Sequence, residues 1–310
     1  MSCKEPFRCH IVIPTYCRPQ LLARTLESIA QADRPHSLQQ VVVVENAVRG
    51  GAEAVCEQFA ERLPVRYFFN QPSGRSRALQ YAMERIEPGL AIMFDDDIRV
   101  APRCLTAYES AACAQGPGTY FGGAAGIDYE QTPDTWMYEY LASSQKGYNT
   151  LAETPRQKGA LRFLGFNLAC FTEDFFAVGG MNPHLGSGAL EPGRGRNPVG
   201  SEWDLQQRFQ AVGVKPEFLP EARVWHYVPA SDCSMAWLLN RRFRVGVEKS
   251  LKRHNCVQRL ITLILSTPWR AVQYLVSFLI PGRRKRYLLR SKAFTWAGEL
   301  QGLRDRRRLD

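Results

Sequence analysis

The sequence lacks paired cysteines. Its nine cysteines are an odd number, and no two of them form a C-x-x-C pair. Disulfide frameworks and zinc sites depend on such spacings, so neither kind of site is expected in this chain. Scattered thiols fit a reducing compartment, and we expect a cytoplasmic protein.

The common glycine-rich phosphate loops are absent as well. A Rossmann fold places G-x-G-x-x-G directly after its first strand, where this chain reads Pro14-Thr15-Tyr16. The P-loop signature is also missing. Both of these nucleotide-binding folds are therefore disfavoured.

Uninterrupted apolar runs are scarce. The first nine residues include Lys4, Glu5 and Arg8 and do not resemble a secretory leader. The most apolar stretch, 260–280, is interrupted by Pro268 and Arg270. A central arginine costs roughly 2.5–3.5 kcal/mol in a membrane span, so we expect no simple span, and Ser266-Thr267-Pro268 reads as the start of a new helix.

Positive charge is concentrated near the C-terminus. Residues 241–310 hold 18 Lys and Arg against 4 Asp and Glu, a net of +14, whereas the whole chain carries +10. The first 240 residues are therefore slightly acidic. A basic segment of this kind favours an anionic partner, either a membrane surface or a nucleic acid.

The first hundred residues alternate between apolar runs and segments of helical period. Strands are predicted at 10–14, 41–44, 65–69 and 90–94, with helices between them that begin near Pro19, Ala52 and a Ser73 cap. This rhythm predicts an α/β fold with a mostly parallel central sheet flanked by helices.

Three consecutive carboxylates, Asp95, Asp96 and Asp97, follow the most apolar of these strands. Ligands bind beyond the carboxyl ends of strands in open α/β sheets. Adjacent acids repel one another unless a cation compensates, and hard divalent cations prefer oxygen ligands. The triplet therefore indicates a metal and phosphate site, the alternative being a solvated acidic turn.

Two later segments add candidate site residues. Residues 184–200 are rich in Gly and Pro and read as a long loop of the kind that forms lids. Ser201 then opens a helix in which Ser201 and Asp204 have the spacing of a capping box. A further strand within 218–228 carries His226, for which a metal ligand and an ordinary core histidine are both open readings.

Taken in order, these pieces resemble the family 2 glycosyltransferases, which have the GT-A nucleotide-sugar-binding fold. The resemblance covers roughly residues 9 to 250. It rests on the residues 14–18, Glu45-Asn46, the Asp triplet, Gly179-Gly180, the segment 202–208 and His226. A D-x-D pattern alone is weak, and the ordered set carries the resemblance.

The resemblance implies a nucleotide-diphosphate sugar as donor. It places Pro14, Thr15, Tyr16 and Arg18 around the nucleotide, with Glu45 beside them. The family more often has Asp at the position of Glu45, and Asn where this chain has Cys17. These two departures leave the identity of the nucleotide base open.

The resemblance also assigns residues to the diphosphate end of the donor. By resemblance, Arg75 contacts the pyrophosphate, and Asp95 contacts ribose or sugar beside Asp96. Asp95, Asp97 and His226 would bind Mg²⁺ or Mn²⁺, which neutralises charge on the leaving group.

Glu202 occupies the second position of the family's usual Glu-Asp pair, and Ser201 occupies the first. Because Asp204 has a capping function in the predicted helix, Glu202 is the candidate general base for the acceptor hydroxyl. Asp204 and, more weakly, Glu191 are rivals for this role.

The sequence thus predicts a GT-A domain over 1–230 and a basic, amphipathic helical region over 231–310. The resemblance implies a metal-dependent, inverting transfer of a sugar to a hydroxyl of a glycan or lipid-linked acceptor. The basic region favours an anionic membrane surface at the inner face of the cell membrane, and no nucleic-acid-binding module is recognisable. The rivals are a degenerate sugar-nucleotide-binding protein and a sugar-phosphate nucleotidyltransferase.

Overall fold

The computed structural model describes residues 7–147, 161–186, 200–251 and 256–306. These residues form two compact units. The first unit comprises the described residues within 1–128, 143–193 and 200–227, and the second comprises those within 129–142 and 228–310. The segment 129–142 therefore groups with the C-terminal helices, although the sequence placed it in the predicted N-terminal domain.

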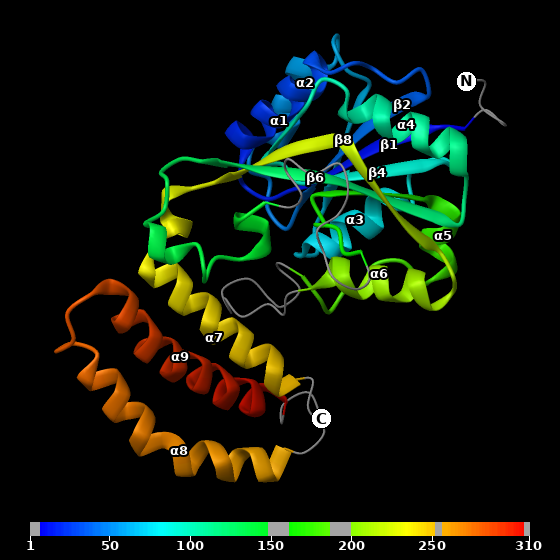
Figure 1. The fold of residues 1–310 in the computed structure, drawn as a ribbon. Coiled ribbons are helices and arrows are strands. Elements are labelled where there is room, and N and C mark those ends of the chain that lie inside the picture. The colour runs from blue at the N-terminus through cyan, green and yellow to red at the C-terminus, as the bar shows by residue number, and fades with distance from the viewer. Residues whose placement is uncertain (1–6, 148–160, 187–199, 252–255, 307–310) are drawn as a thin grey trace. The chain divides into compact units, whose positions relative to one another are not determined.

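The strands and helices of the described residues run in the following order (Figure 1): β1 (Cys9–Thr15), α1 (Pro19–Gln31), β2 (Leu38–Asn46), α2 (Ala52–Phe59), β3 (Val65–Asn70), α3 (Arg75–Met83), β4 (Leu90–Phe94), β5 (Ile98–Val100), α4 (Cys104–Gln115), β6 (Thr119–Tyr129), β7 (Asn167–Phe171), α5 (Thr172–Ala177), α6 (Ser201–Ala211), β8 (Lys215–Val228), α7 (Met235–Leu251), α8 (Cys256–Val276) and α9 (Arg283–Arg306).

One eight-stranded sheet, in the order β3-β2-β1-β4-β7-β6-β8-β5, organises the first unit. Neighbours are parallel from β3 to β4, whereas β7 is antiparallel to β4 and β5 is antiparallel to β8. The predicted α/β sheet is confirmed, and its parallel part is the N-terminal half. Because β1 and β4 run in the same direction, their carboxyl ends meet at one edge.

Two apolar layers cover the two faces of this sheet. Alternate residues of β1 face opposite layers, Ile11 and Ile13 on one side and Val12 on the other. The first layer packs against α1, α2 and α4, and the second against α3, α5 and α6. The central strands β1, β2 and β4 are therefore buried on both faces, which explains their continuous apolar runs.

The helix starts differ from the sequence expectations in two places. Gly74 precedes α3, and its N–H donates to Asn46 Oδ1 at 3.2 Å, so Ser73 does not provide the predicted cap. Gly200, with a φ of 95°, precedes α6, and no side chain caps that helix. The predicted capping box of Ser201 and Asp204 is therefore wrong, because Ser201 is already the first helical residue.

The second unit contains α7, α8 and α9, with α7 and α8 each packing against α9. The backbones of α7 and α9 approach closely at glycines: a Cβ on Gly246 would lie 2.2 Å from Thr295 O, and one on Gly298 would lie 2.0 Å from Phe243 O. Ser250 Oγ also donates to Glu299 O at 2.7 Å. Helices α7 and α9 are therefore closely packed against each other.

Helix α8 continues through Pro268, so the helix start predicted at Ser266 is wrong. The proline removes one backbone donor from the helix. Just before it, the hydroxyls of Ser266 and Thr267 donate to Leu263 O at 3.0 and 3.1 Å. The indole of Trp296 on α9 donates to the same oxygen at 2.9 Å. These bonds anchor the interrupted turn to the neighbouring helix.

Candidate active site in the first unit

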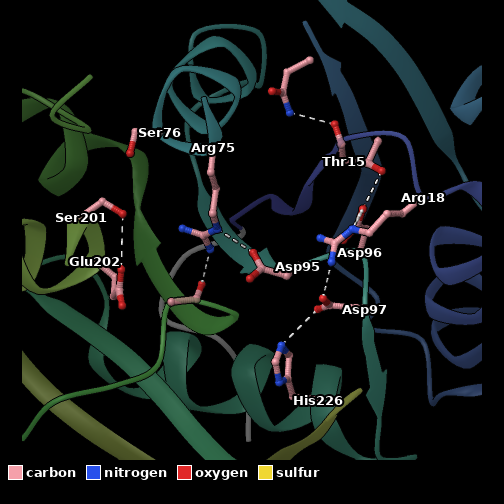
Figure 2. Close-up of polar contacts among 12 residues, drawn as sticks. Thr15, Arg18, Arg75, Ser76, Asp95, Asp96, Asp97, Ser201, Glu202 and His226 are labelled. Carbon is pink, nitrogen blue, oxygen red and sulfur yellow. Dashed lines mark hydrogen bonds and ion pairs between the residues drawn. The ribbon is translucent and has the colours of Figure 1, made fainter. Parts of the chain in front are cut away.

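The acidic triplet follows β4 at the carboxyl edge of the parallel strands. Its three side chains diverge, as Figure 2 shows: Asp95 faces Arg75, whereas Asp96 and Asp97 face Arg18. Each carboxylate therefore has a different environment, although the three residues are adjacent in the sequence.

Asp96 is turned toward the loop that follows β1. Its side chain is fully buried. It accepts a hydrogen bond from Thr15 Oγ1 at 2.6 Å and forms an ion pair with Arg18. Burial raises the pKa of Asp96 to about 7, against the opposing effect of Arg18. These contacts tie the end of β1 to the end of β4. Thr15 and Asp96, both predicted to bind the nucleotide, therefore lie against each other at this point.

Asp97 lies between a cation and a histidine. Arg18 Nη1 donates to Asp97 Oδ2 at 2.7 Å, and His226 Nε2 lies 3.4 Å from Asp97 Oδ1. Antiparallel pairing of Ile98 in β5 with His226 in β8 explains how residues so distant in sequence meet. The Phe166 ring stacks on the imidazole with centroids 4.5 Å apart, which fixes its orientation.

Two atoms at this place are buried without a hydrogen-bond partner among the described residues, namely Asp97 Oδ1 and His226 Nδ1. A bare buried carboxylate oxygen is costly, and a cation would satisfy it. Carboxylate oxygen and imidazole nitrogen are both suitable for Mn²⁺, and such ions often take few protein ligands beside substrate phosphates. Asp97 and His226 therefore fit a divalent cation, although the described residues contain no cluster of three metal-ligating side chains.

The opposite wall of the site is formed by Arg75, the first residue of α3. Its Nε donates to Asp95 Oδ1 at 2.7 Å and its Nη2 donates to Gly165 O at 2.9 Å. Burial alone would lower the pKa of Arg75, but the nearby carboxylates of Asp95 and Glu202 outweigh burial and raise it. A similar balance raises the pKa of Arg18. Two permanent cations therefore flank the triplet.

Glu202 lies in the first turn of α6, close to Arg75. A Cβ on Gly165 would lie 3.0 Å from Glu202 Cβ and 3.3 Å from Arg75 Nη2, so a larger residue at this position would press tightly against both side chains. The Ser201 hydroxyl donates to Glu202 Oε2 at 3.3 Å (Figure 2). Asp204 is engaged elsewhere, because Arg208 Nη2 donates to its Oδ2 at 2.7 Å.

The predicted nucleotide residues of the first two strands fall into two groups. Tyr16 is 47% exposed at the edge of the site, whereas Pro14 is buried within β1. Glu45 is buried, and it accepts hydrogen bonds from Gly50 N at 2.6 Å and from the Tyr67 hydroxyl at 2.7 Å. Both of its oxygens are thus used within the chain, where they hold the loop before α2.

Sequence reasoning did not single out Asn46, Gly165 and Phe166 as site residues. Asn46 joins two loops, because its Nδ2 donates to Thr15 O at 2.8 Å and its Oδ1 accepts from Gly74 N. Asn46 follows a predicted strand directly, which was a usable signal. Gly165 and Phe166 precede β7, where the sequence shows no regular pattern. The predicted lid and Glu191 fall largely on residues 187–199, which lie outside the described residues.

The first unit thus has an α/β sheet with an acidic strand end and two flanking arginines at the carboxyl edge of its parallel strands. The profile of "Glycosyl transferase family 2" matches residues 10–178, which is more than half of the chain. The chain therefore belongs to glycosyl transferase family 2 and is a glycosyltransferase.

Known proteins resemble it over nearly its whole length. The "Succinoglycan biosynthesis protein ExoM" of Rhizobium meliloti (strain 1021) is 27% identical over 309 residues, covering 96% of this chain and 94% of the relative. The solved mannosyltransferase PcManGT from Pyrobaculum calidifontis, in complex with GDP-Man and Mn²⁺, aligns with a TM-score of 0.58 at 17% identity. That alignment covers 97% of this chain and 88% of the other.

A second solved structure, GalNAc-T7 with UDP, GalNAc and Mn²⁺, aligns with a TM-score of 0.52 at 14% identity. It covers 80% of this chain and 51% of that protein. At these identities the two structures establish the GT-A fold of the chain.

Proposed function

We propose that the protein transfers a sugar from a nucleotide-diphosphate donor to a hydroxyl of a glycan or lipid-linked acceptor, in a divalent-metal-dependent, inverting reaction. The observation that carries the proposal is the pair of Asp97 and His226, in which His226 Nε2 lies 3.4 Å from Asp97 Oδ1, a buried oxygen that accepts no hydrogen bond from the described residues. The solved relatives named above hold Mn²⁺ together with a nucleotide sugar or its parts.

In this proposal the diphosphate lies between the two arginines and the triplet. Asp97 and His226 hold Mg²⁺ or Mn²⁺, which when bound neutralises the charge of the leaving nucleoside diphosphate. Arg18 and Arg75 add fixed positive charge on either side of it. Asp95, held by Arg75, faces the ribose or the sugar, and exposed Tyr16 offers a surface on which the nucleotide base can lie. Glu45 acts indirectly, because it holds the loop that the nucleotide base would contact.

Glu202 acts as the general base of the reaction. It takes the proton from the acceptor hydroxyl while that oxygen forms a bond to the anomeric carbon and the bond to the diphosphate breaks. One displacement inverts the anomeric configuration. Asp204 is used by Arg208, so a single acid at the start of α6 is available for this step.

We further propose that the second unit docks on an anionic membrane surface. Helix α8 exposes a one-sided apolar row that includes Ile261, Ile264, Leu265, Trp269, Val272, Leu275 and Val276. No helix among the described residues is long and apolar enough to cross a membrane. An amphipathic helix with exposed arginines nearby in sequence fits an orientation in the plane of the interface. The buried thiols of Cys9, Cys104 and Cys170 form no disulfide, which fits work at a cytoplasmic face.

A donor screen tests the transferase proposal. Wild-type protein is mixed with UDP-, GDP- and dTDP-sugars in Mn²⁺ or in EDTA, and thermal stability and nucleoside diphosphate release are both measured. We expect one donor to stabilise the protein only with Mn²⁺ and to be turned over. Stabilisation without any release would instead indicate a sugar-nucleotide-binding protein, and the absence of both would contradict the proposal.

A further inference from the structure

The second unit contains a cavity of about 440 Å³ whose wall is rich in arginine. Its lining includes Arg283, Arg286, Arg290, Asp134, Trp136 and Met235. The three arginines follow one another at intervals of three and four residues on α9, so they lie on one face of that helix. None of these residues belongs to the donor site described above.

The positive charge of this cavity is only partly neutralised. Arg283 Nη1 forms an ion pair with Asp134 Oδ2 at 2.9 Å, and Asp134 is the only acid in the lining. The Nε atom of Arg286 is buried and has no hydrogen-bond partner among the residues that the structure describes. A buried guanidinium donor without an acceptor is costly, and an anion in the cavity would satisfy it.

Arg290 is held in place by uncharged groups. Its Nε donates to Ser277 Oγ at 2.9 Å, and its guanidinium lies 4.3 Å from the centre of the Phe278 ring. These contacts orient the side chain without cancelling its charge. Arg290 therefore stays available to a ligand that enters the cavity.

Two helix N-termini add to the positive potential. Helix α9 begins at Arg283, and α7 begins at Met235, directly after Ser234, which also lines the cavity. The Ser234 Oγ accepts a hydrogen bond from Trp237 N at 3.1 Å, so one donor of the first turn of α7 is already capped. Helix N-termini carry partial positive charge and favour phosphate groups.

Part of the remaining wall is apolar, and an exposed apolar ring lies beside Arg290. Met137 in the lining is buried in a cluster with Leu238 and Tyr287, against which Trp136 and Met235 pack. Phe278, which lies under Arg290, is 58% exposed and follows the apolar row of α8. A ligand of the cavity would therefore meet positive charge at its head and apolar surface beside it.

We propose that this cavity binds the phosphoryl group of an amphiphile, at a site separate from the donor site. The phosphoryl group belongs either to a phospholipid of the membrane surface or to the diphosphate of a lipid-linked acceptor. The choice of these two sources rests on the proposed function, whereas the phosphate chemistry rests on the cavity alone.

The primary test measures binding of inorganic pyrophosphate to the full-length protein by calorimetry in EDTA. The variant Arg286→Gln with Arg290→Gln is compared with the control Lys285→Gln with Arg304→Gln, which removes two exposed charges from the same helix outside the cavity. We expect the cavity variant to lose about tenfold or more in affinity and the control to stay near wild type. Equal affinities in the two variants, or no binding by the wild type, would overturn the proposal.

A variant of opposite sign guards against misfolding. Asp134→Asn removes the one acid of the lining at an exposed position, so it should tighten pyrophosphate binding severalfold while circular dichroism stays unchanged. Weaker or unchanged binding in this variant would count against the site. Donor binding in Mn²⁺ is measured in parallel for the cavity variant, and it should not change. A protein that binds pyrophosphate here but no donor would refute the transferase proposal and leave this site standing.

Two further probes separate the sources of the phosphate. Farnesyl diphosphate binding more tightly than pyrophosphate, with loss in the cavity variant, would assign the site to a lipid-linked diphosphate. Loss of sedimentation with phosphatidylglycerol vesicles in the cavity variant, without a preference for farnesyl diphosphate, would assign it to a headgroup. If neither ligand distinguishes the cavity variant from its control, the amphiphile assignment is wrong.

Discussion

The two units of the molecule differ in how far their charged side chains are paired and in how much apolar surface they expose. In the first unit, the acids at the end of β4 are matched by Arg18 and Arg75 in partly buried ion pairs. In the second unit, α8 exposes large apolar side chains, with Leu265 76% exposed, and arginines outnumber acids in the cavity beside α9.

This contrast indicates what each unit meets. Burying ion pairs costs desolvation energy and contributes little net stability, so the matched charges of the crevice are better explained by a charged ligand. A large exposed apolar face is rare on a monomeric soluble protein and usually marks an interaction surface. The contrast is what we expect if, as proposed, the first unit binds a diphosphate with its cation and the second an amphiphilic surface.

The largest expected effect concerns the base in the first unit. Glu202→Gln should lower the transfer rate by about 10²–10⁴, the usual contribution of a positioned base, while donor affinity changes only a few-fold. The reason is that a base acts on the acceptor and contacts the donor little. Rates and donor affinities of both proteins, measured with the donor found in the screen, check this.

Asp204→Asn is the matched control for that variant. It breaks the pair with Arg208 one turn along α6 and should cost only about 0.3–0.5 kcal/mol of stability with near-normal turnover. If Asp204→Asn is stable but inactive while Glu202→Gln turns over normally, the roles of the two acids are reversed.

The next effect tests whether the apolar face of α8 acts as a membrane surface. Leu265→Gln with Leu275→Gln should weaken vesicle binding roughly tenfold to a hundredfold, because each leucine loses apolar burial in the interface. Sedimentation with anionic vesicles measures this. Val48→Gln with Val212→Gln changes exposed valines of the first unit and should have no effect. Equal losses of vesicle binding in both variants would show that the apolar face of α8 is not the membrane-binding surface.

A smaller effect concerns a buried ionisable group of the first unit that has no matched charge. His10 is 1% exposed, and burial lowers its pKa from 6.5 to about 4, against the opposing effect of Glu87. Between these values the unfolded chain binds the proton and the folded chain does not, so stability falls as the pH drops below 6.5.

Lowering the pH from 7 to 5 should therefore cost about 2 kcal/mol of unfolding free energy through His10. Urea unfolding of wild type and His10→Phe at both pH values measures this contribution, since the variant should lose that part of the pH dependence. The same pH dependence in both proteins would show that His10 is not the group responsible.

The smallest effect concerns the loop that carries Arg18. Cys17 has a φ of 50°, in the left-handed region that asparagine tolerates better than most residues. This explains physically why the family's usual Asn suits the position. Cys17→Asn should raise the unfolding free energy by about 0.5–1 kcal/mol, whereas Cys17→Ala should not. A gain of equal size in both variants would mean that the thiol itself, and not the backbone, is unfavourable.

The parallel half of the sheet could be predicted from the sequence because each strand is a continuous apolar run followed by its polar ending. The triplet after β4 was found for the same reason, whereas His226, within the strand predicted in 218–228, was singled out by the family resemblance. Their meeting could not be derived from spacing, because it depends on the antiparallel pairing of β5 with β8.

The wrong expectations share a physical cause. Ser201 and Asp204 have capping-box spacing, yet a glycine in the left-handed conformation precedes α6 and shifts the helix start by one residue. Local rules, which describe isolated helices, predict a helix start at Ser266-Thr267-Pro268. Packing on α9 and the hydroxyls of Ser266 and Thr267 keep α8 continuous. In both cases, contacts beyond the local sequence decided the outcome.

The most direct test of the proposed donor site is the affinity of Asp97→Asn for the donor, by calorimetry with and without Mn²⁺. Asp33→Asn, which changes an exposed acid of the same unit, is the control. We predict that Mn²⁺ strengthens donor binding in the wild type and in Asp33→Asn but has no effect in a folded Asp97→Asn. An unchanged effect of Mn²⁺ in Asp97→Asn would contradict the assignment of the metal to this carboxylate.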